Sequence, residues 1–311
     1  MGIMNRVVSR HLRGRRAFSS SVIFDRAAKR QQRNNIAARA DGAEFEYLKD
    51  EVARRLIDRL EDLRDEEGLG GIQELIQCDS AEKLLFRDFK SGASDEQSNS
   101  RKCILVFAQV PNPILTQTRV CCYMLELKCI LVRTKRLIAD EEFLPFPPGH
   151  FDLIMSSLSL HWVNDLPSTF KQVLESLKPD GAFVGAVLGG DSLQELRSAF
   201  ILADQERQGG ISPHISPFMN VPDAGNVLVS SGFQLCTVDT DFITVDYPDA
   251  FVLMEDLQGM GENNAVLSRG APVTRDTLLA AASIYQSMYA NADGTRSMKE
   301  IGSPTVDHVE A

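Results

Sequence analysis

Two polar stretches follow apolar runs and carry side chains suited to binding a ligand. Asp140 and Glu141 come directly after the apolar residues 137–139, and residues 157–162, Ser-Leu-Ser-Leu-His-Trp, follow the apolar run 151–155. In open α/β sheets, ligands bind outside the carboxyl ends of the strands. A carboxylate there accepts a hydrogen bond from an amino group of a purine ring, and such a bond contributes about 1.5–3 kcal/mol. We therefore expect Asp140 to contact a ligand.

Two histidines are the candidate catalytic residues. His161 stands beside Trp162 in the second stretch, and the alternative is that both rings only pack this loop. His214 lies between Ser212-Pro213 and Ser216-Pro217, where it acts on a substrate or only braces the loop. No metal site is expected, because the cysteines form no CxxC pair and residues 68–139, which hold five of the six, contain no histidine.

Alternating elements must position these residues. The apolar stripe from Phe45 to Leu63 predicts an amphipathic helix over 43–66. From residue 151 on, short apolar runs alternate with helical periodicity, which predicts a mainly parallel sheet with helices on both faces. The expected strands are 151–155, 182–188, 233–239 and 242–247. The expected helices are 167–177, one from Asp191 or Ser192 to Arg207, 222–231, and one that begins at Thr274.

Composition excludes several classes of protein. The chain has 311 residues, of which 43% are hydrophobic, so it can build a core and is not disordered throughout. No run of about 18 uncharged apolar residues occurs, so no transmembrane segment is predicted. The net charge of −10 argues against binding nucleic acid, which requires clustered lysine and arginine.

Residues 1–24 differ from the rest of the chain. They contain five arginines and several serines but no acidic residue, which is typical of a mitochondrial presequence. The segment Arg16-Ala17-Phe18-Ser19 predicts cleavage after Phe18; the alternative is a disordered basic tail. A presequence places the mature protein in the mitochondrial matrix, either free or peripheral to the inner membrane.

Several motifs together resemble a known family. The Asp-Glu-Glu-Phe-Leu-Pro-Phe segment at 140–146, the Phe-Asp-Leu-Ile strand at 151–154 and the Leu-His-Trp-Val-Asn-Asp loop at 160–165 are similar to class I S-adenosylmethionine-dependent methyltransferases. The runs His-Ile-Ser-Pro-Phe at 214–218 and Met-Glu-Asp-Leu-Gln-Gly-Met-Gly at 254–261 narrow the resemblance. They match the branch of mitochondrial complex I assembly factors that hydroxylate a protein arginine.

The resemblance implies a fold, a cofactor and a role. The fold is a methyltransferase-type, Rossmann-like α/β domain over 25–294, with an antiparallel last strand. The cofactor is S-adenosylmethionine, with Asp140 at its adenine. Its other expected contacts are Glu141 and the loop residues Ser157, Leu158, His161 and Trp162. The partner is an iron–sulfur subunit of respiratory complex I, which carries the arginine to be modified.

The chain departs from this family at two places. Family members carry an acidic-x-Gly-x-Gly-x-Gly loop after the first strand, whereas the atypical segment 68–139 stands there and lacks it. The first unit of the sheet is therefore expected to be disrupted, and Gly68 is interpreted as a helix cap. The tail 295–311 is expected to diverge where the family continues with a strand, as in a splice variant or a faulty gene model.

Three functions remain open from the sequence. The first is an arginine-hydroxylating assembly factor, and the second is an O-methyltransferase acting on a carrier-bound acid. The third is an assembly protein without catalysis, which the missing glycine loop favours, because side chains would stand where the cofactor lies. Binding of S-adenosylmethionine is expected to be far weaker than in relatives with the loop.

Overall fold

The computed structural model describes residues 22–62, 74–85, 102–107, 133–270, 272–289 and 296–310. Two sequence predictions lie outside these ranges: the presequence up to residue 21 and the cap at Gly68. In the described part of the chain, no helix is both long and apolar enough to cross a membrane.

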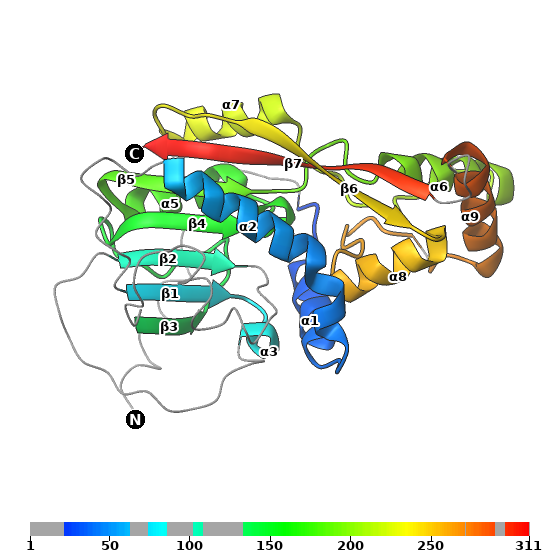
Figure 1. Ribbon diagram of the computed structural model, residues 1–311, viewed down its shortest axis with the longest axis horizontal. Helices are drawn as coiled ribbons and strands as arrows, with labels where there is room; N and C mark the ends of the chain where they lie inside the picture. The colour runs from blue at the N-terminus through cyan, green and yellow to red at the C-terminus, as the bar shows by residue number, and fades with distance from the viewer. Residues whose placement is uncertain are drawn as a thin grey trace.

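The centre of the molecule is one sheet of seven strands, in the order β3-β1-β2-β4-β5-β7-β6 (Figure 1). The strands are β1 Glu74–Asp79, β2 Lys102–Phe107, β3 Arg133–Ile138, β4 Phe151–Ser157, β5 Leu177–Ala186, β6 Asp239–Tyr247 and β7 Arg296–Glu310. Strand β7 runs antiparallel to both of its neighbours, and the pairs among β1 to β5 are parallel. This confirms the predicted mainly parallel sheet with an antiparallel last strand.

The first two strands occupy exchanged positions. In the common doubly wound order 3-2-1-4-5-6, the first strand is central and lies beside the fourth. Here β2 pairs with β4, and β1 lies on the far side of β2. A strand other than the first therefore fills the central position, after which the cofactor loop of such folds normally comes. The predicted disruption of the first sheet unit takes this form.

Segment 68–139 supplies β1, β2 and β3 as parallel strands of the sheet. Two expectations about strands were wrong. The tail 295–311 does not lack the last strand, because 296–310 form β7 between β5 and β6. The predicted strand 233–239 does not form: Leu235 has a φ of 52° in the left-handed region, which extended backbone excludes, and β6 begins only at Asp239.

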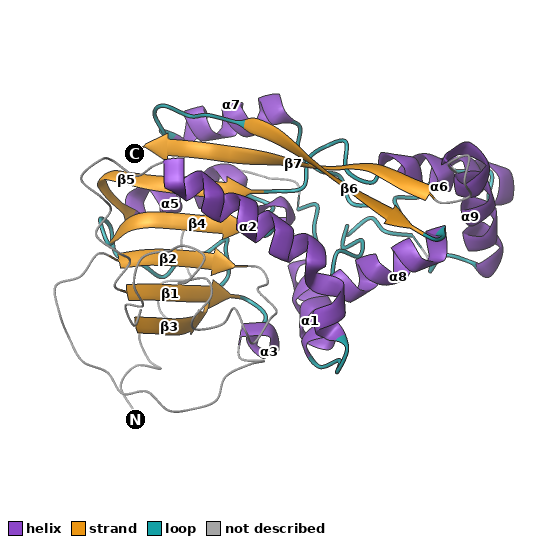
Figure 2. Cartoon of the chain, viewed as in Figure 1, coloured by secondary structure: helices purple, strands orange, loops and turns teal. Residues whose placement is uncertain are grey.

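Helices cover both faces of the sheet and its carboxyl end (Figure 2). They are α1 Arg26–Ala37, α2 Tyr47–Asp62, α3 Glu82–Leu85, α5 Leu166–Ser176, α6 Gln194–Arg207, α7 Val221–Ser231, α8 Ala250–Met260 and α9 Arg275–Tyr289, with 3₁₀ turns at Gly42–Glu46 and Leu160–Trp162. The sequence analysis did not predict α1, which begins where the Asp25 side chain accepts a hydrogen bond from the Ala28 amide. It also placed the start of α6 too early, since Leu193 is the cap residue and no side chain caps the helix.

Alternate residues of the central strands build two separate cores. Met155 of β4 and Val184 of β5 pack with the apolar stripe of α2 on one face. Ile154 and Phe183, their neighbours in sequence, pack with α5 and α7 on the other. Because successive side chains of a strand point to opposite faces, a strand buried on both sides must be apolar throughout. This explains why Leu153, Ile154 and Met155 are consecutive apolar residues.

Candidate functional site

Acidic side chains gather at the carboxyl end of the sheet. Asp79 is the last residue of β1, and Asp140, Glu141 and Glu142 follow β3. Strands β1 and β3 are paired in parallel up to Asp79 and Ile138, so their ends meet at one edge. The sequence predicted Asp140 and Glu141 at a strand end, and the structure places both there. We call these four carboxylates the edge acids.

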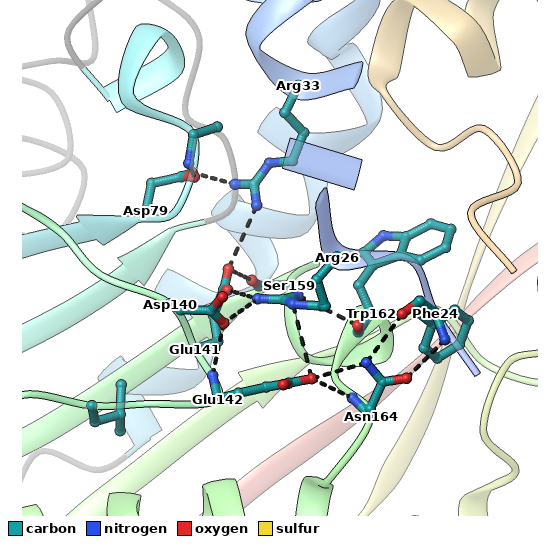
Figure 3. A network of polar contacts seen from close by, with 12 residues as sticks. Phe24, Arg26, Arg33, Asp79, Asp140, Glu141, Glu142, Ser159, Trp162 and Asn164 are labelled. Carbon is teal, nitrogen blue, oxygen red and sulfur yellow. Dashed lines mark hydrogen bonds and ion pairs between the residues drawn. The ribbon is translucent and has the colours of Figure 1, made fainter. Parts of the chain in front are cut away.

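Two arginines of α1 face the edge acids (Figure 3). Nη2 of Arg26 lies 2.6 Å from Oδ1 of Asp140 and also donates to Glu141. Its Nε lies 3.9 Å from Oε1 of Glu142. Helix α1 packs at the end of the sheet because Phe24, just before it, contacts the ring of Trp162 edge to face. The helix thus brings one guanidinium to three carboxylates in turn.

Arg33, two turns further along α1, is fully enclosed. Its side chain is 3% exposed and pairs with Asp79 and with Glu141, each 2% exposed. Burial would raise the pKa of Glu141, but the charges of Arg26 and Arg33 outweigh it and hold that pKa at about 2. Burial raises the pKa of Asp79 to about 7, against the attraction of Arg33. Glu141 is therefore firmly ionised, and Asp79 titrates near neutral pH.

Asp79 was not predicted from the sequence. Methyltransferase-type folds use an acid at the end of their second strand for the ribose hydroxyls, but no strand was expected within residues 74–79. Strand β1 occupies the second position in the sheet and ends in Asp79. The apolar residues Leu75, Ile76 and Cys78 were the available sign of a strand. Polar residues at both ends and in the middle of 74–79 hid this pattern, although the strand is paired on both sides.

The predicted pocket loop lies beside the edge acids. Ser157 and Leu158 are buried at the end of β4, and Leu158 has a φ of 48° where the chain turns out of the strand. The next hydroxyl group, that of Ser159, donates to Oε1 of Glu141 at 2.6 Å. The loop and the edge acids are thus one hydrogen-bonded unit. Whether Ser157 and Leu158 contact a cofactor stays a prediction.

His161 and Trp162 share one buried acid from another part of the chain. Nε2 of His161 lies 3.2 Å and Nε1 of Trp162 lies 3.0 Å from Oε2 of Glu262, just after α8. Burial lowers the pKa of His161, so a neutral ring donates through Nε2. Its Nδ1 is buried and has no hydrogen-bond partner among the described residues. Such a nitrogen is able to accept a proton or a hydrogen bond.

A buried lysine completes this cluster. Nζ of Lys29 lies 3.2 Å from the centroid of the Trp162 ring and donates to the carbonyl oxygens of Gly261 and Asn263 at 2.7 and 2.9 Å. Burial lowers the pKa of Lys29 to about 7, although the negative charge of Glu262 opposes this shift. The same helix that pairs with the edge acids is thereby fixed to the loop after α8.

His214 belongs to a different network. Its Nε2 lies 2.8 Å from Oδ2 of the fully buried Asp204 on α6, which also accepts from the Ser212 amide at 2.9 Å. The imidazole stacks on Phe200, with 4.7 Å between ring centroids. These contacts hold the loop 212–218 on α6, as the bracing alternative requires. A catalytic role for His214 stays a prediction.

Comparison with known proteins places the chain in a family. Residues 113–185 match the methyltransferase domain family. The chain is 43% identical over 302 residues to the protein of Rattus norvegicus named arginine-hydroxylase NDUFAF5, mitochondrial, covering 91% of this chain and 79% of that protein. Its Homo sapiens counterpart is 43% identical over 281 residues, covering 88% and 73%.

A second group of relatives matches a shorter stretch. The malonyl-acyl-carrier-protein O-methyltransferase of Xylella fastidiosa is 37% identical over 158 residues, which is 50% of this chain and 51% of that protein. The longer alignments extend over most of both sequences, and the topology of the sheet agrees with a methyltransferase-type fold. The chain therefore belongs to the family of the mitochondrial arginine-hydroxylase NDUFAF5.

Proposed function

We propose that this chain is a mitochondrial assembly factor of respiratory complex I that binds S-adenosylmethionine and hydroxylates an arginine of an iron–sulfur subunit. The observation that carries the proposal is the identity of 43% over 302 residues to a relative named as a mitochondrial arginine-hydroxylase. The Arg-rich, acid-free residues 1–24 support import into the matrix. The assignment of a complex I subunit as the partner rests on the resemblance of the sequence motifs to the family.

The residues at the carboxyl edge fit one end of the cofactor. The side chain of Asp140 is 37% exposed, so its carboxylate can accept a hydrogen bond from the adenine amino group. By the family pattern Asp79 would accept hydrogen bonds from the ribose hydroxyls, but it is paired with Arg33 and both side chains are enclosed. S-adenosylmethionine supplies an electrophilic sulfonium when it is bound. The adenine end is therefore available, whereas the ribose end requires Arg33 to release Asp79.

The missing glycine loop is expected to lower the affinity for S-adenosylmethionine. The sequence contains no acidic-x-Gly-x-Gly-x-Gly motif, so no bare backbone of that kind can lie against the cofactor. We expect the chain to bind S-adenosylmethionine more weakly than relatives with the loop. We expect Asp140→Ala to weaken the remaining affinity about ten- to a hundredfold, the value of one charge-assisted hydrogen bond.

Two measurements test the proposal. Titration calorimetry of the chain with S-adenosylmethionine should give saturable binding that Asp140→Ala weakens and that Lys178→Ala, a partly exposed residue of β5, leaves unchanged. Mass spectrometry of the iron–sulfur subunits should show a hydroxylated arginine in cells that carry the chain and not in cells that lack it. An unmodified arginine in cells with abundant chain would reject the hydroxylase assignment.

The second candidate is methyl transfer to a carrier-bound acid. It is favoured by the 37% identity over 158 residues to a malonyl-acyl-carrier-protein O-methyltransferase. The same mass analysis separates the two, because hydroxylation adds one oxygen and methylation adds one CH₂. If calorimetry shows no binding of S-adenosylmethionine at all, the non-catalytic assembly protein becomes the best interpretation.

A further inference from the structure

Arg197, in the first turn of α6, is a cation without an acidic partner. Its Nη2 donates to the carbonyl oxygen of Ser216 at 3.2 Å, and its Nε is buried without any hydrogen-bond partner in the described part of the chain. Burial lowers the pKa of Arg197, and no carboxylate of the described residues forms an ion pair with it. A guanidinium has five donors, so Arg197 keeps donors that the described residues do not occupy.

The surroundings of Arg197 connect it to the candidate site. Its Cζ lies 5.8 Å from the centroid of the Phe218 ring, and the same ring lies 6.0 Å from the ring of His161. The neighbouring residue Met219 bridges to Gly189, just beyond β5. Arg197 therefore lies where the chain leaves β5, and only one aromatic ring separates it from the loop that follows β4.

The residues around Arg197 are held in place by contacts between α6 and the loop 212–218. Arg197, Phe200 and Asp204 are spaced at three and four residues and share one face of α6. Phe200 and Asp204 bind His214, so loop 212–218 is attached to α6 at both of its ends. The Nε of Arg197 is buried and the rest of the side chain is partly exposed, so a cation fixed in this way, with no acid among the described residues, can take a partner from solution.

We propose that Arg197 is the binding site for a carboxylate of the acceptor molecule. A guanidinium binds a carboxylate through two parallel hydrogen bonds, and its planar fork gives the pair both strength and direction. The site is separate from the edge acids, which select cationic and hydroxyl groups, and it does not depend on the hydroxylation chemistry proposed above.

The test uses the full chain with its arginine side chains labelled with ¹⁵N, observed by NMR and titrated with sodium malonate at constant ionic strength. The Nε–H signal of Arg197, identified by its absence in Arg197→Lys and Arg197→Gln, should shift saturably. Either variant should weaken malonate binding at least tenfold. The control Arg207→Gln, at the exposed end of the same helix, should bind malonate like the parent.

Two further titrations identify the source of the carboxylate. S-adenosylmethionine, which carries its own carboxylate, and inorganic phosphate are added in separate experiments. A shift of the Arg197 signal with malonate but not with S-adenosylmethionine supports the acceptor site. A shift only with S-adenosylmethionine, a shift only with phosphate, or equal malonate binding by the parent and Arg197→Gln would each overturn it. Malonate binding is measured without cofactor or partner protein. The titration therefore still tests the Arg197 site if the proposed function proves wrong.

Discussion

Replacing Arg33 with methionine should destabilise the fold strongly, because it leaves two enclosed acids without their shared cation. Arg33 is 3% exposed and pairs with Asp79 and Glu141, each 2% exposed. Removing one member of a buried ion pair costs about 3–5 kcal/mol, since the remaining charge stays desolvated. The free energy of unfolding, measured by urea titration at pH 8, should fall by that amount.

The pH dependence of this loss has a definite sign. The pKa of Asp79 is raised to about 7 in the folded chain, so in the parent the carboxyl is ionised at pH 8 and protonated at pH 5. Without Arg33 its pKa rises further, and Asp79 stays protonated at both. In the unfolded chain Asp79 is ionised throughout this range, so between pH 7 and 8 the parent loses no further stability, whereas the variant loses about 1.4 kcal/mol for one pH unit. The penalty of Arg33→Met should therefore be about 1.4 kcal/mol smaller at pH 5.

The matched control is Lys178→Met. Lys178 also forms an ion pair, with Asp152 at 2.8 Å, but its side chain is 38% exposed, and such pairs contribute about 0–1 kcal/mol. Equal decreases in the free energy of unfolding for Arg33→Met and Lys178→Met would show that the buried ion pairs of α1 stabilise the fold no more than an exposed pair does. A penalty that grows as the pH falls would show that Asp79 is not the group that titrates.

Three more outcomes are expected from the described packing. Gly259→Ala in α8 should lower the thermal unfolding midpoint, because the added Cβ would overlap the ring of Phe45, and it should lower it less in a Phe45→Ala background, where the overlapping atoms are gone. Asp204→Asn should cost about 1–3 kcal/mol in urea unfolding, because the fully buried acceptor for His214 is altered, whereas exposed Asp223→Asn should not. Stability of the parent should gain a component between pH 7 and 10.5 that Lys29→Met lacks, since the pKa of Lys29 is lowered to about 7 and only the unfolded chain binds that proton there.

The sequence predicted the elements that depend on local periodicity. Strand β4, helix α5 and helix α7 follow directly from apolar spacing and turn residues, and each forms within a few residues of its expected limits. Strands β1 and β7 were not found, because each is short of apolar residues or interrupted by polar ones. Their extended structure depends on pairing with strands distant in the sequence, which a local pattern does not contain.

Some residues of the candidate site could also be predicted from the sequence and others could not. Asp140 and His161 were found because each follows a recognisable strand, and the structure places them in one neighbourhood through Glu141 and the loop 157–162. The roles of Arg26 and Arg33 were not found. Their partners lie 46 to 115 residues away in the sequence, and an arginine on an amphipathic helix normally faces solvent. Only the position of α1 across the sheet edge makes them part of the site.

The arrangement of charge constrains what can bind between the two sides of this site. The edge acids are four carboxylates that face two guanidiniums, which leaves an excess of negative charge while Asp79 is ionised. Arg197, beyond the ring of Phe218, is a positive charge without an acidic partner among the described residues. Cationic and hydroxyl groups are favoured at the edge acids and a carboxylate of the acceptor is favoured at Arg197, whereas an anion at the edge acids would be repelled. We expect selection of the ligand to rest on this separation of charge, and an anionic nucleotide without a cationic group should therefore bind poorly.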